Sequence, residues 1–192
     1  MSIISKYNFA PTEQSKQNLL KEGKDAASIY VTGNTAIDAL KTTVRADYTH
    51  PELEWAKGSR LILITAHRRE NLDEPMQHMF RAIRRVMDEH PDVKAIYPIH
   101  MNPVVRETAN SILGGDDRIH IIEPLEVLDF HNFLSRSYLI LTDSGGIQEE
   151  APSLGKPVLV MRDTTERPEG IAAGTLLSLI HISEPTRRRG IS

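Results

Sequence analysis

Short, mainly apolar runs alternate along this chain with longer stretches of helical periodicity, and the run at 61–65 is apolar on consecutive residues. The apolar runs lie at residues 29–31, 61–65, 93–99, 119–122, 138–142 and 157–161. Strands that are apolar on consecutive residues are typical of parallel sheets buried on both faces. Helical patterns lie between them, at residues 35–40, 72–87, 104–112, 127–134 and 145–154. The alternation predicts an α/β fold with a Rossmann-like, doubly wound parallel sheet.

Composition limits the class of protein and of ligand. The 192 residues are 40% hydrophobic and 26% charged, as in a globular protein, and 23 basic against 26 acidic side chains give a net charge of −3. This balance excludes a general polyanion binder, so we expect no nucleic-acid partner and only a local phosphate site. The chain has no cysteine, which excludes disulfides and thiolate chemistry. Its eight histidines are scattered, without the short spacings of a zinc-binding helix. We expect neither a metal ion nor a cofactor.

The two ends of the chain depart from this rhythm. The start lacks the pattern of a signal peptide and no apolar run reaches membrane-spanning length, so we expect a cytoplasmic protein without a membrane partner. We expect residues 1–175 to form one domain that is incomplete at both ends. Residues 176–192 end in a basic run. They are either a solvated basic tail or a non-native segment left by cloning or sequencing, and we favour the second.

The run DSGGIQEE (143–150) follows the apolar run at 138–142 and leads into a helical pattern. In an open parallel sheet, ligands bind beyond the carboxyl ends of the strands. Gly145 and Gly146 allow a phosphate to approach the free amides of a helix start, and Ser144 can cap that helix or donate to a ligand oxygen. Glu150 lies one turn further on the same face, where a carboxylate can accept both hydroxyls of a ribose. The alternative is a tight turn with a capping serine.

Three further loops carry groups that suit an anion. TAHRREN (65–71) places His67 and Arg68 at the mouth of a buried strand, although an exposed basic loop has the same composition. PIHMNP (98–103) contains His100. A ligand contact by His100 and a helix-capping loop with an incidental histidine explain this run equally well. RDTTERPE (162–169) offers Arg167, with salt bridges inside the loop as the alternative. An aromatic residue at Phe130 can stack on a base or belong to the core.

These runs, together with FAPTE (9–13) and VTGNT (31–35), resemble the non-hydrolysing bacterial UDP-N-acetylglucosamine 2-epimerases. The resemblance extends in order from Tyr7 to Thr175 and fails from Leu176 onward. It implies one half of a two-domain glycosyltransferase-B-type fold, namely the carboxyl-terminal UDP-binding domain. The partners that it implies are the missing amino-terminal domain, UDP-N-acetylglucosamine or UDP, and a second subunit in a homodimer of the full-length protein.

The resemblance also implies roles for individual residues. The diphosphate is held by Ser144, Gly145 and Gly146, and the ribose hydroxyls by Glu150. Uracil contacts the backbone of Leu125 and the side chain of Phe130. The phosphates are reached by Arg167 and His67, of which His67 is the expected catalytic residue. A second, regulatory UDP-sugar site is implied at Arg68 and His100.

The implied activity is an isomerase that interconverts UDP-N-acetylglucosamine and UDP-N-acetylmannosamine by loss and re-addition of UDP. Positive groups and a helix start stabilise the leaving diphosphate, whereas carboxylates must handle the proton on C2. In the family those carboxylates belong mainly to the amino-terminal domain, so we expect this chain alone to be inactive. The alternatives are a hydrolysing epimerase, a UDP-sugar glycosyltransferase of the same fold, and a stand-alone UDP-sugar-binding module.

Overall fold

The computed structural model describes residues 4–68 and 72–162 and the backbone of residues 176–178. The chain divides into two compact units, Met1–Thr42 and Thr43–Ser192. The first unit contains β1 (Asn8–Ala10), α1 (Glu13–Lys21), a short 3₁₀ helix η2 (Ala26–Ser28), β2 (Ile29–Val31) and most of α2 (Thr35–Thr43). The strand expected at residues 29–31 is present, but it pairs in parallel with β1 in a separate two-stranded sheet. Strand β1 is only three residues long and was not expected from the sequence.

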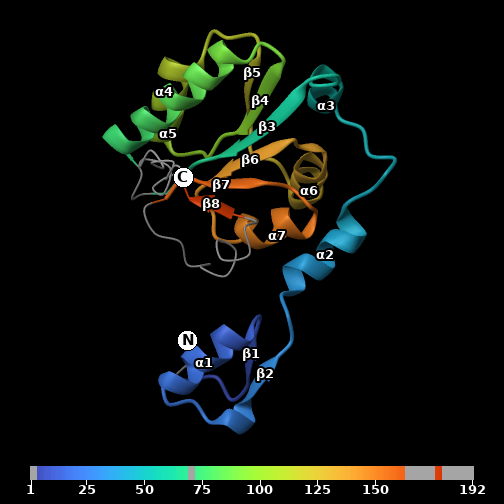
Figure 1. Ribbon diagram of the computed structural model, residues 1–192, viewed down its shortest axis with the longest axis vertical. Helices are drawn as coiled ribbons and strands as arrows, with labels where there is room; N and C mark the ends of the chain where they lie inside the picture. Colours follow the sequence, from blue (N-terminus) through green and yellow to red (C-terminus); the bar gives the residue numbers. More distant parts are fainter. Residues whose placement is uncertain (1–3, 69–71, 163–175, 179–192) are drawn as a thin grey trace, which may run out of the picture. The chain divides into compact units, whose positions relative to one another are not determined.

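The second unit contains a single parallel sheet, with a helix between each two successive strands from β3 to β7 (Figure 1). Its strand order is β5-β4-β3-β6-β7-β8, and every neighbouring pair is parallel. The elements are α3 (Pro51–Trp55), β3 (Arg60–Thr65), α4 (Glu74–Glu89), β4 (Val93–Pro98), α5 (Pro103–Leu113), β5 (Ile119–Ile122), α6 (Val127–Arg136), β6 (Leu139–Thr142), α7 (Ile147–Ser153), β7 (Val158–Val160) and β8 (Leu176–Ser178). The prediction of a doubly wound α/β fold is confirmed.

Apolar cores cover both faces of this sheet. On one face α4 and α5 pack through residues such as Phe80 and Val105, and on the other face α6 and α7 pack through Phe133 and Ala151. The residues of β3 divide between the two cores: Ile62 and Ile64 face α4 and α5, whereas Leu61 and Leu63 face α6 and α7. This division explains why β3 is apolar at consecutive positions, because side chains of a strand point alternately to opposite faces.

The strand order reverses between β3 and β6. From β3 the chain proceeds outward through β4 and β5, and it then returns to place β6 on the other side of β3. The carboxyl ends of β3 and β6 therefore form the topological switch point, where ligands bind in sheets of this kind. At the far edge, β8 takes up Leu176–Ser178, the first residues of the segment expected to be foreign to the fold. Residues 179–192 lie outside the described part of the chain.

Candidate functional site

The two strands at the switch point end on a pair of hydroxyl groups. Thr65 on β3 lies opposite Thr142 on β6, and their Oγ1 atoms are 2.6 Å apart in the buried interior. The backbone N–H of Ser144 donates to Oγ1 of Thr142 at 3.0 Å. Because buried hydroxyls are stable only when hydrogen bonded, this contact fixes the start of both loops side by side.

Asp143 follows β6 and joins the two loops. Its carboxylate is fully buried, and Oδ2 accepts the backbone N–H groups of His67 and Arg68, each at 2.8 Å. Its Oδ1 lies 3.4 Å from Nδ1 of His67. The sequence predicted a diphosphate-binding run that begins at Asp143, but this side chain holds the neighbouring loop. No sequence signal connects Asp143 to a partner 76 positions away.

A third tie to the same loop comes from β4. The phenol of Tyr97 is fully buried and donates to the carbonyl oxygen of Ala66 at 2.5 Å. Burial raises the pKa of Tyr97 well above its ordinary value, and the negative charge of Asp143 raises it further. The Tyr97 hydroxyl is therefore a permanent donor at physiological pH. From the sequence, Tyr97 was expected only to form part of a strand.

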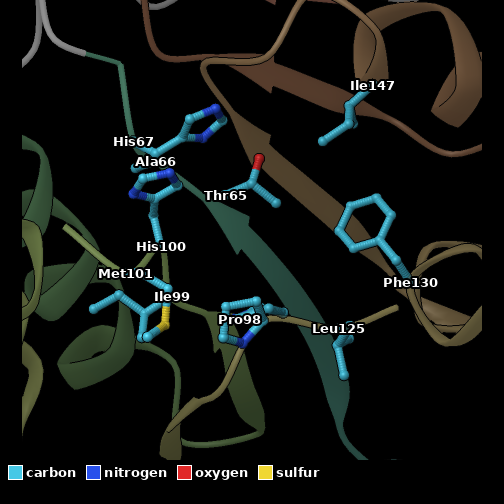
Figure 2. A pocket seen from close by; sticks show the side chains of 11 residues that line it. Thr65, Ala66, His67, Pro98, Ile99, His100, Met101, Leu125, Phe130 and Ile147 are labelled. Atoms are coloured by element: carbon cyan, nitrogen blue, oxygen red, sulfur yellow. The ribbon is translucent and has the colours of Figure 1, made fainter. Parts of the chain in front are cut away.

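A cavity of about 380 Å³ opens at these strand ends (Figure 2). The imidazole rings of His67 and His100 stack with their centroids 5.4 Å apart and their planes 13° from parallel. Phe130 and Leu125 also line the cavity, so the structure brings together four residues that follow three different strands: His67 after β3, His100 after β4, and Leu125 and Phe130 after β5. The remaining lining residues are Thr65, Ala66, Pro98, Ile99, Met101, Pro124 and Ile147. Arg68 is partly buried and is not among the lining residues.

The loop with His100 also caps a helix. Asn102 accepts the N–H of Val104 through its side chain at 3.1 Å, and Pro103 occupies the first turn of α5. Nδ1 of His100 accepts the backbone N–H of Asn102 at 3.1 Å. The helix-capping loop that the sequence allowed at residues 98–103 is therefore present, with Asn102 as the N-cap. With Nδ1 engaged in the loop, Nε2 is the nitrogen of His100 that carries the proton in the neutral ring.

The glycine run after β6 leads directly into α7. Gly146 occupies the N-cap position without a side-chain hydrogen bond, so Ser144 does not cap the helix. Gly146 is exposed, and a Cβ atom added there meets only Oε1 of Glu150, at 3.9 Å. The backbone of Gly146 is therefore open to a ligand, and its φ of −64° does not require glycine. Steric access distinguishes this position more than backbone conformation does.

Glu150 lies one turn into α7 and is largely buried. Its side chain is 16% exposed, and this burial raises the pKa of its carboxyl group. The nearby imidazole of His131 opposes that shift; its Nε2 atom is 3.7 Å from Oε2 of Glu150. His131 was missed in the sequence because it lies in a helical pattern without any motif around it.

The run RDTTERPE (162–169) that follows β7 contains two arginines. Arg162 is buried directly after that strand. Arg167, expected to contact a phosphate, lies outside the described residues. Within the described residues, no three His, Cys, Asp or Glu side chains are placed to share a metal ion. No helix in the same part of the chain is long and apolar enough to cross a bilayer.

Known proteins resemble this chain over nearly all of its length. The profile of the UDP-N-acetylglucosamine 2-epimerase family matches residues 1–185. A UDP-N-acetylglucosamine 2-epimerase of Bacillus subtilis is 66% identical over 173 residues, which cover 90% of this chain and 46% of that protein. The chain thus spans about half the length of the curated relatives it matches.

Solved structures agree. The S. aureus MnaA–UDP complex is 56% identical, with a TM-score of 0.86, over 91% of this chain and 47% of that one. The Neisseria meningitidis UDP-GlcNAc 2-epimerase bound to UDP-GlcNAc is 46% identical, with a TM-score of 0.83, over 91% of this chain and 49% of that one. The α/β fold therefore matches one domain of glycosyltransferase-B-like epimerases. This chain belongs to the UDP-N-acetylglucosamine 2-epimerase family.

Proposed function

We propose that this chain is the UDP-binding part of a non-hydrolysing UDP-N-acetylglucosamine 2-epimerase, an isomerase that forms UDP-N-acetylmannosamine. The observation that carries the proposal is the cavity at the switch point, where His67, His100, Leu125 and Phe130 converge beside the open glycine backbone at Gly146. Solved relatives hold UDP or UDP-GlcNAc, which supports a nucleotide-sugar as the ligand. The domain assignment, residues 1–175 for UDP binding and 176–192 as a non-native tail, belongs to the same proposal.

The cavity suits the parts of a uridine diphosphate. The ring of Phe130 offers a stacking face for uracil, and Leu125 lies beside it. The diphosphate binds the backbone at Ser144, Gly145 and Gly146, with His67 and Arg167 as donors to its oxygens. Glu150 accepts the two ribose hydroxyls. Arg68 and His100 form the second, regulatory UDP-sugar site, and the stacking of His100 on the His67 ring supports a contact between the two sites.

The steps of epimerisation are divided between this chain, which holds the leaving UDP, and an amino-terminal domain, which moves the proton. The C2–H bond breaks as its proton passes to a carboxylate, and its electron pair forms the C1=C2 bond of 2-acetamidoglucal. The C1–O bond breaks at the same stage, and its electrons leave with UDP. Re-addition of UDP at C1 and of a proton to the opposite face of C2 gives the epimer. Here His67 stabilises the leaving diphosphate, and its ring is held in place by Asp143.

The exposed side chains of the first unit support the proposal that the full-length protein has a further, amino-terminal domain. The two-stranded parallel sheet of the first unit exposes the side chains of Phe9, Tyr30 and Val31, and Tyr7, directly before β1, is exposed as well. An isolated two-stranded sheet is marginally stable, and parallel sheets are normally covered on both faces. The carboxylates that move the C2 proton belong to that absent domain, so the chain alone is expected to bind UDP without catalysing epimerisation.

Calorimetry and product analysis test the proposal. The purified chain is titrated with UDP and then incubated with UDP-N-acetylglucosamine, alone and with a separately produced amino-terminal half. We expect UDP binding, no turnover by the chain alone, and formation of UDP-N-acetylmannosamine when both halves are present. Release of free N-acetylmannosamine indicates a hydrolysing epimerase, and transfer to an acceptor indicates a glycosyltransferase. Binding without complementation supports a stand-alone module, and absence of UDP binding refutes the proposal.

A further inference from the structure

A buried histidine stands next to the proposed ribose-binding carboxylate. His131 lies on α6, is 6% exposed, and is followed by the buried residues Asn132, Phe133 and Leu134. Its Nδ1 atom is 2.7 Å from the Thr43 hydroxyl, and its Nε2 atom is 3.7 Å from Oε2 of Glu150. Burial of a polar ring is unfavourable unless both nitrogens have partners. His131 therefore bridges two residues that are 107 positions apart in the numbering, Thr43 and Glu150.

The geometry favours one neutral form of this ring. If the Thr43 hydroxyl donates to Nδ1, the proton of the neutral imidazole is on Nε2 and faces the carboxylate. A separation of 3.7 Å is longer than a hydrogen bond, so both carboxylate oxygens remain available to a ligand. The N–H dipole still favours the ionised carboxylate and restricts its rotation. An apolar side chain at position 131 fills the same space without either effect.

Thr43 is itself held in place by α6. Its carbonyl oxygen accepts a hydrogen bond from the side-chain amide of Asn132, with an Nδ2–O distance of 2.8 Å. The Oδ1 atom of Asn132 in turn accepts a hydrogen bond from the backbone N–H of Arg45 at 3.0 Å. Arg136 donates to the carbonyl oxygen of Arg45 at 2.8 Å. These bonds fix the segment that leads from α2 into the second unit. The Thr43 hydroxyl is thus a fixed point against which the imidazole is oriented.

We propose that His131, oriented by Thr43, is a positioning residue that keeps the Glu150 carboxylate directed toward the ribose hydroxyls of the nucleotide. This inference rests on the proposed function, because it requires that Glu150 bind a ribose. A merely structural His131 contributes to folding and leaves ribose recognition unchanged. The distinguishing quantity is therefore the preference for a ribose over a 2′-deoxyribose.

The test is calorimetric titration of the full chain with UDP and with 2′-deoxy-UDP. We expect the chain to bind UDP more tightly, and His131→Leu to weaken UDP binding about tenfold, with less than about a twofold effect on 2′-deoxy-UDP. His131→Gln, which retains an N–H donor, is expected to restore part of the preference. Thr43→Val removes the hydroxyl at nearly constant volume and is expected to reduce the preference in the same direction. Thr42→Val is the matched control, because the hydroxyl of Thr42 donates to Ala39 within its own helix.

The outcomes separate this inference from the function on which it rests. If the unaltered chain binds no UDP, the proposed function fails and the role of His131 fails with it. If UDP binds and the preference over 2′-deoxy-UDP is unchanged in His131→Leu and in Thr43→Val, only the positioning role is overturned. Circular dichroism verifies that each variant is folded. If His131→Leu does not fold, the Thr43→Val result decides the question alone.

Discussion

Asp143 and His67 are joined twice across the switch point of the sheet. Oδ2 of Asp143 accepts the backbone N–H of His67 at 2.8 Å, and Oδ1 lies 3.4 Å from the Nδ1 atom of the same residue. One buried carboxylate therefore fixes the main chain of the proposed catalytic histidine and also lies close to its ring. Such an arrangement sets which ring nitrogen faces the ligand, because Nδ1 is directed at the carboxylate.

Replacement of Asp143 is expected to destabilise the fold. Asp143→Asn removes the charge that strengthens two backbone hydrogen bonds, so the free energy of unfolding should fall by about 1.5–3 kcal/mol. Urea denaturation followed by circular dichroism measures the change. Asp117→Asn, at an exposed position after α5, serves as the control. Equal stability of the Asp143 and Asp117 variants contradicts the structural role assigned to Asp143.

Tyr97→Phe tests the hydrogen bond from Tyr97 to the loop that carries His67. Loss of the hydrogen bond to Ala66 leaves a buried carbonyl without this donor and should lower the free energy of unfolding by about 1–2 kcal/mol at pH 7. Because the folded state raises the pKa of Tyr97, the folded chain holds this proton more tightly than the unfolded chain. The stabilisation from Tyr97 is thus complete below the ordinary tyrosine pKa and declines as the pH rises above it. Denaturation curves between pH 7 and pH 11 should converge for the two proteins, and parallel curves contradict this assignment.

Glu150→Gln should affect stability and binding in opposite directions. Burial raises the pKa of Glu150, so the ionised carboxylate destabilises the fold at neutral pH. A neutral amide removes that penalty, and the melting temperature at pH 7.5 should rise by roughly 1–3 °C. The gain should vanish as the pH falls through the raised pKa, because Glu150 is then also neutral in the unaltered chain. UDP affinity should fall about tenfold. A lower melting temperature together with unchanged UDP affinity contradicts both roles assigned to Glu150. Glu149→Gln, which removes the neighbouring carboxylate, is the control.

Phe130→Ala examines the proposed uracil contact. Base stacking on an aromatic ring contributes about 1–3 kcal/mol, so the affinity for UDP should fall by about 5- to 150-fold. Phe9→Ala, which removes an exposed ring in the first unit, should leave the affinity unchanged. Calorimetry on both variants with UDP provides the comparison. If both bind like the unaltered chain, uracil does not stack on Phe130.

The sequence identified five strands of the main sheet, β3 to β7, because each lies in a mainly apolar run. In β3 the run is continuous, because Leu61 and Ile62 face opposite cores. The short helix α3 and strand β1 were missed because each spans too few residues to show a period. The loops that line the cavity were identified from their position after strands. Asp143 and His131 act through partners far away in the sequence, Arg68 and Thr43 among them, and such pairings depend on the strand order and on helix packing.

The hydrogen bonds that fix Thr43 on α6 also decide where the molecule can be divided. A truncated version that begins at residue 35 retains α2, and with it the Thr43 hydroxyl and its bond to His131. One that begins at residue 44 keeps the whole large sheet yet loses that hydroxyl and the carbonyl that Asn132 binds. A fragment designed to contain only the large sheet should therefore begin upstream of α2. It then retains the contact between Thr43 and His131, the residue proposed to orient Glu150.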